Sequence, residues 1–241
     1  MKYHMLDPQI TTVLFDLDGT LLPMELEKFT NTYFGLLAKK AAPFGFQPEP
    51  LVAAVWKGTK AMVKNDGTET NDKRFWDTFA GEMGEEILQL RPVFDGFYAN
   101  EFHGAKAACG ENPLARRAID GLKAKGYDVV LATNPIFPMV GVETRLSWVG
   151  LRPEDFSYIT AYENSTTCKP NPAYYAEILR NTGKRPQECL MVGNDATEDT
   201  AALEQGIGVY LVTDCLLNPK GRDISGVPQG TFAAFLEFAG V

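Results

Sequence analysis

Short runs of apolar, β-branched residues recur along the chain, and longer stretches with apolar residues at every third or fourth position separate them. The short runs are typical of buried strands, and the longer repeat is typical of helices with one buried face. Strands are predicted at residues 13–15, 127–132, 156–162, 189–192 and 207–212. Helices are predicted at residues 113–125, 139–149, 172–181, 197–205 and 231–240. This alternation predicts an α/β fold with a parallel sheet covered on both faces.

One long segment interrupts the alternation. Helical stretches at residues 25–42, 50–65, 71–83 and 85–101 follow one another without a convincing strand. We therefore expect an all-α domain, residues 22–105, inserted into a Rossmann-like, doubly wound core of residues 1–21 and 106–241. Aromatic side chains at helical spacing are interpreted as the packed core of these inserted helices. They are Phe29, Tyr33, Phe34, Trp56, Phe75, Trp76 and Phe79.

The composition narrows the classes of partner. With 31 acidic and 23 basic residues the net charge is −8, which argues against a broad nucleic-acid surface. The chain contains no run of roughly 18 apolar residues, so no membrane span is predicted. The first residues do not resemble a signal peptide. The four cysteines form no CxxC pair, which is typical of isolated thiols in a reducing compartment. We expect a cytoplasmic protein without nucleic-acid or membrane partners, and leave the oligomeric state open.

Two carboxylates directly follow the first predicted strand. Asp16 and Asp18 stand two residues apart, so in an extended segment both side chains face the same side. Carboxylates at the end of an apolar strand are costly unless other groups compensate their charge. In open α/β sheets, the place for such compensation is the crevice beyond the carboxyl ends of the strands.

The other predicted strand ends and nearby loops supply further polar groups for that crevice. They are Thr133, Asn134, Lys169, Asn194, Asp195 and Asp199. Several acids in one crevice call for a hard cation, and carboxylate and carbonyl oxygens suit Mg²⁺. A lysine and a threonine suit a phosphate group. An aspartate can then serve as nucleophile and form an aspartyl-phosphate that water hydrolyses.

Four short motifs carry a family resemblance. "DLDGT", "ATN", "CKP" and "GNDATED" occur in this order within residues 10–213. They resemble the four motifs of the haloacid dehalogenase superfamily of phosphohydrolases, and the inserted helices resemble that family's cap between its first and second motifs. One such motif alone is moderately specific, whereas all four in order are much more so.

The resemblance implies a role for each residue. Asp16 is expected to be the nucleophile and Asp18 the general acid/base. Thr133 is expected to bind the transferring phosphate with Asn134 beside it, and Lys169 to neutralise the charge of nucleophile and phosphate.

The resemblance also implies a Mg²⁺ site. The expected ligands are the carboxylate of Asp16, the backbone carbonyl of Asp18 and the carboxylate of Asp195. Asn194 occupies a position where many relatives have Asp, and Asp199 is expected to support the site from behind the ligands. The function expected from these residues is a Mg²⁺-dependent phosphatase of a small phosphorylated metabolite.

Three alternative functions remain to be weighed. A phosphomutase of the same family uses the same residues. A 2-haloacid dehalogenase is disfavoured because Asp18 and Asp195 are present, and a receiver-like signalling domain is disfavoured by the long helical insertion. The sequence does not name the substrate, and basic residues of the insertion either meet it or, as we favour, are solvated. They are Lys57, Lys60, Lys64, Lys73 and Arg74.

Overall fold

A six-stranded parallel sheet forms the centre of the computed structural model, which describes residues 6–241. The first five residues of the expected core therefore lie outside the described residues. The strand order is β3-β2-β1-β4-β5-β6, and every neighbouring pair is parallel. The strands are β1 (Thr12–Phe15), β2 (Asp128–Leu131), β3 (Tyr158–Ile159), β4 (Cys189–Gly193), β5 (Gly208–Val212) and β6 (Gln229–Gly230). The predicted α/β fold is confirmed, while the short edge strand β6 was not predicted.

The register of the central strands positions the polar residues that follow them. Phe15 of β1 pairs with Leu131 of β2 on one side and with Val192 of β4 on the other. All three strands run in the same direction, so their carboxyl ends meet at one edge of the sheet. The "DLDGT", "ATN" and "GNDATED" motifs therefore begin side by side.

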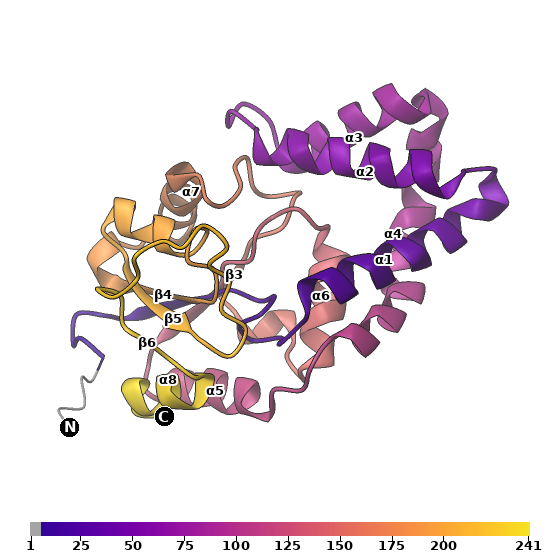
Figure 1. Ribbon diagram of the computed structural model, residues 1–241. Helices are drawn as coiled ribbons and strands as arrows, with labels where there is room; N and C mark the ends of the chain where they lie inside the picture. The colour runs from indigo at the N-terminus through magenta and orange to yellow at the C-terminus, as the bar shows by residue number, and fades with distance from the viewer. Residues whose placement is uncertain (1–5) are drawn as a thin grey trace.

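Helices cover both faces of the sheet (Figure 1). On one face lie α5 (Pro113–Ala124), α6 (Met139–Trp148) and α8 (Phe232–Ala239), and on the other lies α7 (Pro172–Thr182). Alternate residues of β1 serve the two faces: Phe15 packs in the first cluster and Leu14 in the second.

One predicted core helix is shorter than expected. Residues 197–205 form a 3₁₀ helix only over Thr200–Gln205. Before it, the carboxylate of Asp195 accepts hydrogen bonds from the backbone N–H groups of Thr197 and Glu198. The side chain thus caps the turn that Asp199 N–H closes on the carbonyl of Asp195 at 3.0 Å.

The inserted segment consists of helices and overhangs one end of the core (Figure 1). Its α-helices are α1 (Leu26–Ala41), α2 (Pro48–Val63), α3 (Asn71–Met83) and α4 (Arg91–Ala99). The single helix expected at residues 85–101 is wrong, because a 3₁₀ helix over Glu85–Leu90 precedes α4. Pro92 lies in the first turn of α4, where proline is tolerated but cannot continue a preceding α-helix.

The two chain segments that connect the insert to the core run antiparallel and bond to each other. The backbone N–H of Gly110 donates to the carbonyl of Pro23 at 2.7 Å, and Met24 forms a β-bridge with Cys109. At the start of α3, Asp72 N–H donates to the carbonyl of Tyr162 at 2.8 Å. The insert therefore contacts the core at separate places.

Between residues 6 and 241, no helix has the length and apolar character needed to cross a membrane.

Candidate active site

The loop after β1 places Asp16 and Asp18 at the carboxyl edge of the sheet. Asp16 N–H still donates to Val192 O at 2.9 Å, as in the strand, and the chain then turns so that Leu22 N–H donates to Leu17 O. Gly19 has φ +90, and a Cβ there would lie 2.3 Å from Asn194 Nδ2. Glycine is therefore required here both by the backbone conformation and by the close approach of a side chain.

Lys169 joins two buried carboxylates. Its Nζ donates to Asp16 Oδ1 at 2.9 Å and to Asp199 Oδ1 at 2.7 Å, and its side chain is 1% exposed. Burial raises the pKa of Asp16 to about 7, against the opposing effect of Lys169. Burial disfavours the charge of Lys169, but Asp16 and Asp199 carry its pKa well above its usual value. The ammonium is therefore held charged beside both acids.

Asp199 supports the loop after β4 from below. Its Oδ2 accepts from Asp195 N–H at 2.8 Å, and a Cβ at Gly193 would lie 2.1 Å from this oxygen. Asn194 is also engaged, since its Nδ2 donates to Cys215 O at 2.7 Å and its Oδ1 accepts from Thr20 Oγ1 at 3.0 Å. Both polar atoms of Asn194 thus bond to the neighbouring loops after β1 and β5, and Asn194 and Asp195 both line the cavity above.

Thr133 and Asn134 follow β2 and lie at the same edge. The carbonyl of Thr133 accepts from Thr160 Oγ1 at 2.7 Å and from Tyr174 Oη at 2.8 Å. Asn134 Nδ2 donates to both carboxylate oxygens of Glu198 at 3.0 Å. Burial, together with neighbouring acids, raises the pKa of Glu198 to about 8 despite Lys169. The ATN motif is thereby tied to the GNDATED motif.

The structure brings all the predicted site residues together. Most of them line one cavity of about 330 Å³ between the core and the insert: Asp16, Asp18, Thr133, Asn134, Asn194, Asp195 and Asp199. Lys169 is not part of the cavity wall, but its Nζ donates a hydrogen bond to Asp16, which is. In the described part of the chain, no three His, Cys, Asp or Glu side chains are already grouped as a metal site.

Arg145 is a site residue that sequence reasoning missed. It is fully buried on α6, where its guanidinium forms an ion pair with Asp18, its Nε donates to Gly141 O at 3.1 Å, and it lies 4.2 Å from the centroid of the Phe137 ring. The available signal was an arginine on the apolar side of a predicted helix, three residues after Val142. Such a position requires a buried partner for the charge.

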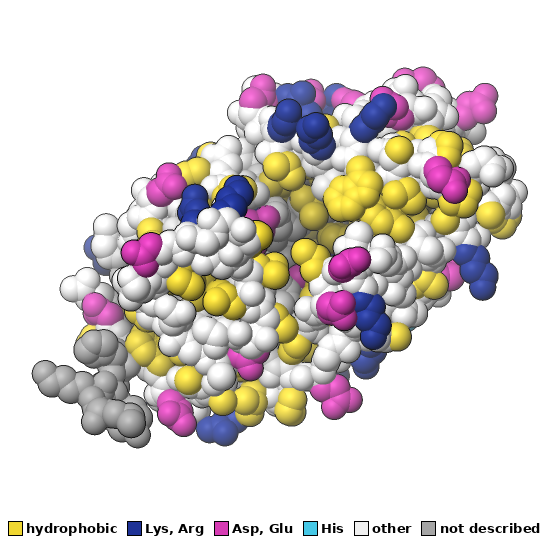
Figure 2. Space-filling view, in the orientation of Figure 1, with side chains coloured by type: hydrophobic (Ala, Val, Ile, Leu, Met, Phe, Trp, Pro, Cys, Tyr) yellow, Lys and Arg dark blue, Asp and Glu magenta, His cyan; other side chains and the backbone are white. Residues whose placement is uncertain are grey.

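The aromatic side chains of the insert have a second role beyond packing. Phe29, Tyr33, Trp76 and Phe79 are buried in the hydrophobic core, as predicted. All seven predicted aromatic residues also line the cavity above the carboxylates. Their interpretation as helical packing alone is therefore incomplete. Figure 2 shows hydrophobic side chains gathered around the hollow between insert and core.

Known proteins resemble this chain over most of its length. The family described as haloacid dehalogenase-like hydrolase matches residues 10–206. The pyrophosphatase PpaX of Bacillus velezensis is 23% identical over 202 residues, 84% of this chain and 82% of that protein. The phosphoglycolate phosphatase of Shigella dysenteriae is 25% identical over 208 residues, 82% of this chain and 79% of that protein. A solved 2-haloacid dehalogenase from Pseudomonas syringae shares the fold, with a TM-score of 0.59 and 19% identity over 96% of this chain and 98% of that one.

Proposed function

Because this chain belongs to the haloacid dehalogenase-like hydrolase family, we propose that it is a Mg²⁺-dependent phosphatase that hydrolyses small phosphate monoesters. The resemblance drawn from its four motifs is thereby confirmed, and the chain is a hydrolase. One observation carries the proposal for its chemistry. Asp16 and Asp18 line the same cavity but have different cationic partners, Lys169 for the first and Arg145 for the second. Two carboxylates in different surroundings are suited to two different roles.

The donor set at the cavity suits a hard divalent cation. The acidic side chains of the core that line the cavity outnumber the two cations that contact them, Lys169 and Arg145. These acids are Asp16, Asp18, Asp195 and Asp199, and Glu198, whose pKa is raised to about 8 by burial, lies beside them. A phosphate cannot approach so much negative charge without additional compensation.

We assign the Mg²⁺ ligands to the carboxylate of Asp16, the carbonyl of Asp18 and the carboxylate of Asp195. Asn194 is disfavoured as a ligand because both of its side-chain polar atoms already bond to Thr20 and Cys215. Of the Asp195 carboxylate, in contrast, the described residues engage Oδ1 alone. When bound, Mg²⁺ would neutralise charge on the phosphate and hold Asp16 ionised. Asp199 supports the site through its bonds to Lys169 and to the backbone of Asp195.

The proposed reaction has two steps. In the first, an oxygen of Asp16 attacks phosphorus, the bond to the leaving oxygen breaks, and Asp18 donates its proton to that oxygen. In the second, Asp18 takes a proton from water, the water oxygen attacks the aspartyl-phosphate, and inorganic phosphate leaves with Asp16 restored. Thr133 and Asn134 are assigned to the phosphate oxygens, and Lys169 to the charge on Asp16 and the phosphate.

We further assign the helical insert to the role of a cap over this reaction. Its helices provide the wall opposite the carboxylates, and covering the cavity excludes water that would weaken the electrostatic interactions. The boundaries proposed from sequence, residues 22–105, fall close to the hydrogen bond between Gly110 and Pro23, where the two connecting segments lie side by side.

Phosphate release from a panel of phosphate monoesters tests the proposal. The intact protein should release phosphate with Mg²⁺ present, lose this activity in EDTA and regain it when Mg²⁺ is restored. The Asp16→Asn variant should be inactive throughout. Release of halide from 2-chloropropionate without phosphate release from any ester would contradict the proposal and favour the dehalogenase alternative.

A further inference from the structure

Aromatic side chains make up much of the wall of the cavity above Asp16. Aromatic side chains from all four α-helices of the insert line it, and Phe137 and Tyr162 of the core complete the wall. The ring centroids of Phe34 and Trp56 lie 5.4 Å apart, and those of Phe75 and Phe79 lie 5.3 Å apart. Such spacings are typical of packed aromatic groups. The carboxylates of the core thus face a wall made largely of aromatic side chains.

Trp56 is the part of this wall that packing does not explain. It is 52% exposed although it is large and apolar, and it stands on α2 among the residues that line the cavity. Exposed aromatic groups that gather in a hollow are typical of binding surfaces. A partner for the Trp56 ring is therefore to be sought inside the cavity.

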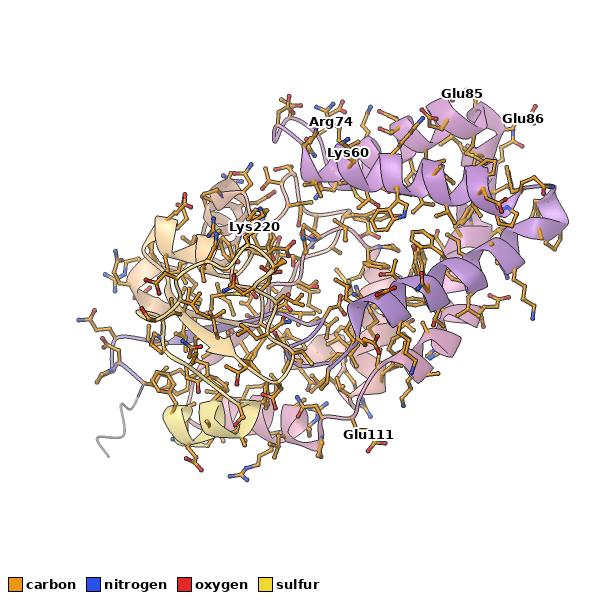
Figure 3. All side chains as sticks on the ribbon, viewed as in Figure 1. Lys60, Arg74, Glu85, Glu86, Glu111 and Lys220 are labelled. Atoms are coloured by element: carbon orange, nitrogen blue, oxygen red, sulfur yellow. The ribbon has the colours of Figure 1, made fainter. Side chains whose placement is uncertain are left out.

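Positive charge is missing from the same wall. Within residues 6–241, no Lys, Arg or His side chain lines the cavity. Three of the basic residues of the insert instead pair with acids on its surface: Lys57 with Glu82 at 2.5 Å, Lys73 with Asp77 at 2.6 Å, and Arg74 with Asp66 at 2.8 Å. Lys60 is exposed on α2 as well, and Figure 3 labels it and Arg74 in the insert.

The wall of the cavity also contains an acidic side chain, which disfavours negatively charged leaving groups. Asp95 of α4 lines the cavity from the insert side, and burial raises the pKa of its carboxyl group. A leaving group that carries a carboxylate or a second phosphate would therefore meet acids at the floor, an acid in the wall and no cation in the insert. An uncharged apolar leaving group meets no such penalty.

We propose that the substrate is a phosphate monoester of a small, uncharged aromatic alcohol. Its phosphate lies at Asp16, and its ring lies against the aromatic wall near Phe34, Trp56 and Phe75. The cavity of about 330 Å³ is near the lower end of the roughly 300–1,000 Å³ of ligand pockets, which favours a compact ring system. This inference rests on the proposed phosphatase function and narrows it to a class of substrate.

Three esters of primary alcohols test the inference without large differences in leaving-group chemistry. They are 2-phenylethyl phosphate, ethyl phosphate and 2-phosphoglycolate. With Mg²⁺ present, kcat/KM of the intact protein should be highest for 2-phenylethyl phosphate, at least about tenfold above ethyl phosphate, and lowest for 2-phosphoglycolate. Equal or better hydrolysis of 2-phosphoglycolate would overturn the inference but leave the phosphatase function intact. Failure to hydrolyse any phosphate ester would instead overturn the proposed function on which the inference rests.

A pair of variants tests the wall itself. Trp56→Ala should lower the ratio of kcat/KM for 2-phenylethyl phosphate to that for ethyl phosphate by about tenfold. Phe44→Ala is the matched control, because Phe44 is another exposed aromatic residue of the insert, at 46%, and does not line this cavity. This control should leave the ratio unchanged. The same ratio in wild type and in Trp56→Ala, with circular dichroism showing that both are folded, would overturn the placement of the ring.

Discussion

The guanidinium of Arg145 forms an ion pair with the carboxylate of Asp18 at the edge of the active-site cavity. Arg145 is completely buried, whereas 26% of the Asp18 side chain is exposed. Within the described residues, Asp18 Oδ1 and Arg145 Nη2 are buried without a hydrogen-bond partner. Each of the two charges therefore depends on the other for compensation, and the contact restricts the orientation of the proposed acid/base.

Replacing Arg145 should damage both stability and turnover. Arg145→Met leaves Asp18 without its cationic partner, and we expect the free energy of unfolding to fall by about 3 kcal/mol, the lower end of the range for broken buried pairs. Because Asp18 is no longer oriented, kcat should fall about 10- to 100-fold while KM changes little. Urea unfolding and steady-state kinetics measure these effects. Arg180→Met, at an exposed arginine, is the matched control, and an unchanged kcat in Arg145→Met would show that the ion pair does not orient Asp18.

The two aspartates should fail in different ways. Asp16→Asn removes the nucleophile, so turnover and the covalent phosphoenzyme should both disappear. Asp18→Asn removes the acid and base, which is typically worth about 10²–10⁴-fold in rate. An aryl phosphate hardly needs the proton for its leaving group, whereas hydrolysis of the aspartyl-phosphate still needs the base. Asp18→Asn should therefore accumulate phosphoenzyme with an aryl phosphate.

Mass spectrometry after a rapid acid quench detects this species as one added phosphoryl group. Peptide mapping should place it on Asp16. Wild-type protein treated in the same way is the control and should carry less label at steady state. A phosphoryl group mapped to Asp18 would exchange the two roles, and normal turnover in either variant would rule out the mechanism.

The proposed Mg²⁺ ligands predict different effects for substitutions at the neighbouring residues Asn194 and Asp195. Asp195→Asn removes a charged ligand, so the Mg²⁺ concentration needed for half-maximal activity should rise at least about tenfold. Asn194→Ala should change this concentration less, because the Asn194 side chain bonds to Thr20 and Cys215 within the protein. Titration of Mg²⁺ into protein freed of metal with EDTA measures both values. A larger effect from Asn194→Ala than from Asp195→Asn would reverse the assignment.

In the metal-free protein, the titration of Asp16 should make the free energy of unfolding depend on pH. Burial raises the pKa of Asp16 from 3.8 to about 7, although Lys169 opposes this shift. The folded state therefore keeps a proton that the unfolded state releases, and the stabilisation is complete below about pH 4 and lost as the pH rises to about 7. In EDTA, the free energy of unfolding of wild type relative to Asp16→Asn should fall across this window by on the order of a few kcal/mol.

Urea unfolding of both proteins at several pH values measures this difference. Asp16→Asn cannot ionise, so the comparison removes the contribution of the titrating groups that do not interact with Asp16. A difference in stability that grew with rising pH would mean that Asp16 is easier to ionise in the folded protein than in the unfolded chain.

The sheet, the helical character of the insert and the polar residues that follow the strands can be predicted from local sequence patterns. Apolar runs such as that of β1 are local signals, and parallel strands must end at the same edge, so residues that follow different strands come together without knowledge of the packing. For this reason Asp16, Thr133 and Asp195 were predicted as neighbours, and the structure places all three on one cavity. Their catalytic roles stay predictions.

The contacts between helix faces, in contrast, cannot be predicted from these local patterns. The pattern of α6 marks position 145 as inward-facing, but its partner Asp18 lies 127 residues away in sequence. The aromatic residues of the insert show the same limit, because helical spacing cannot distinguish a ring that packs in a core from one that faces a cavity. Periodicity defines which side of a helix is apolar. What that side contacts depends on long-range packing, and this packing placed Arg145 beneath Asp18 and Trp56 opposite the carboxylates.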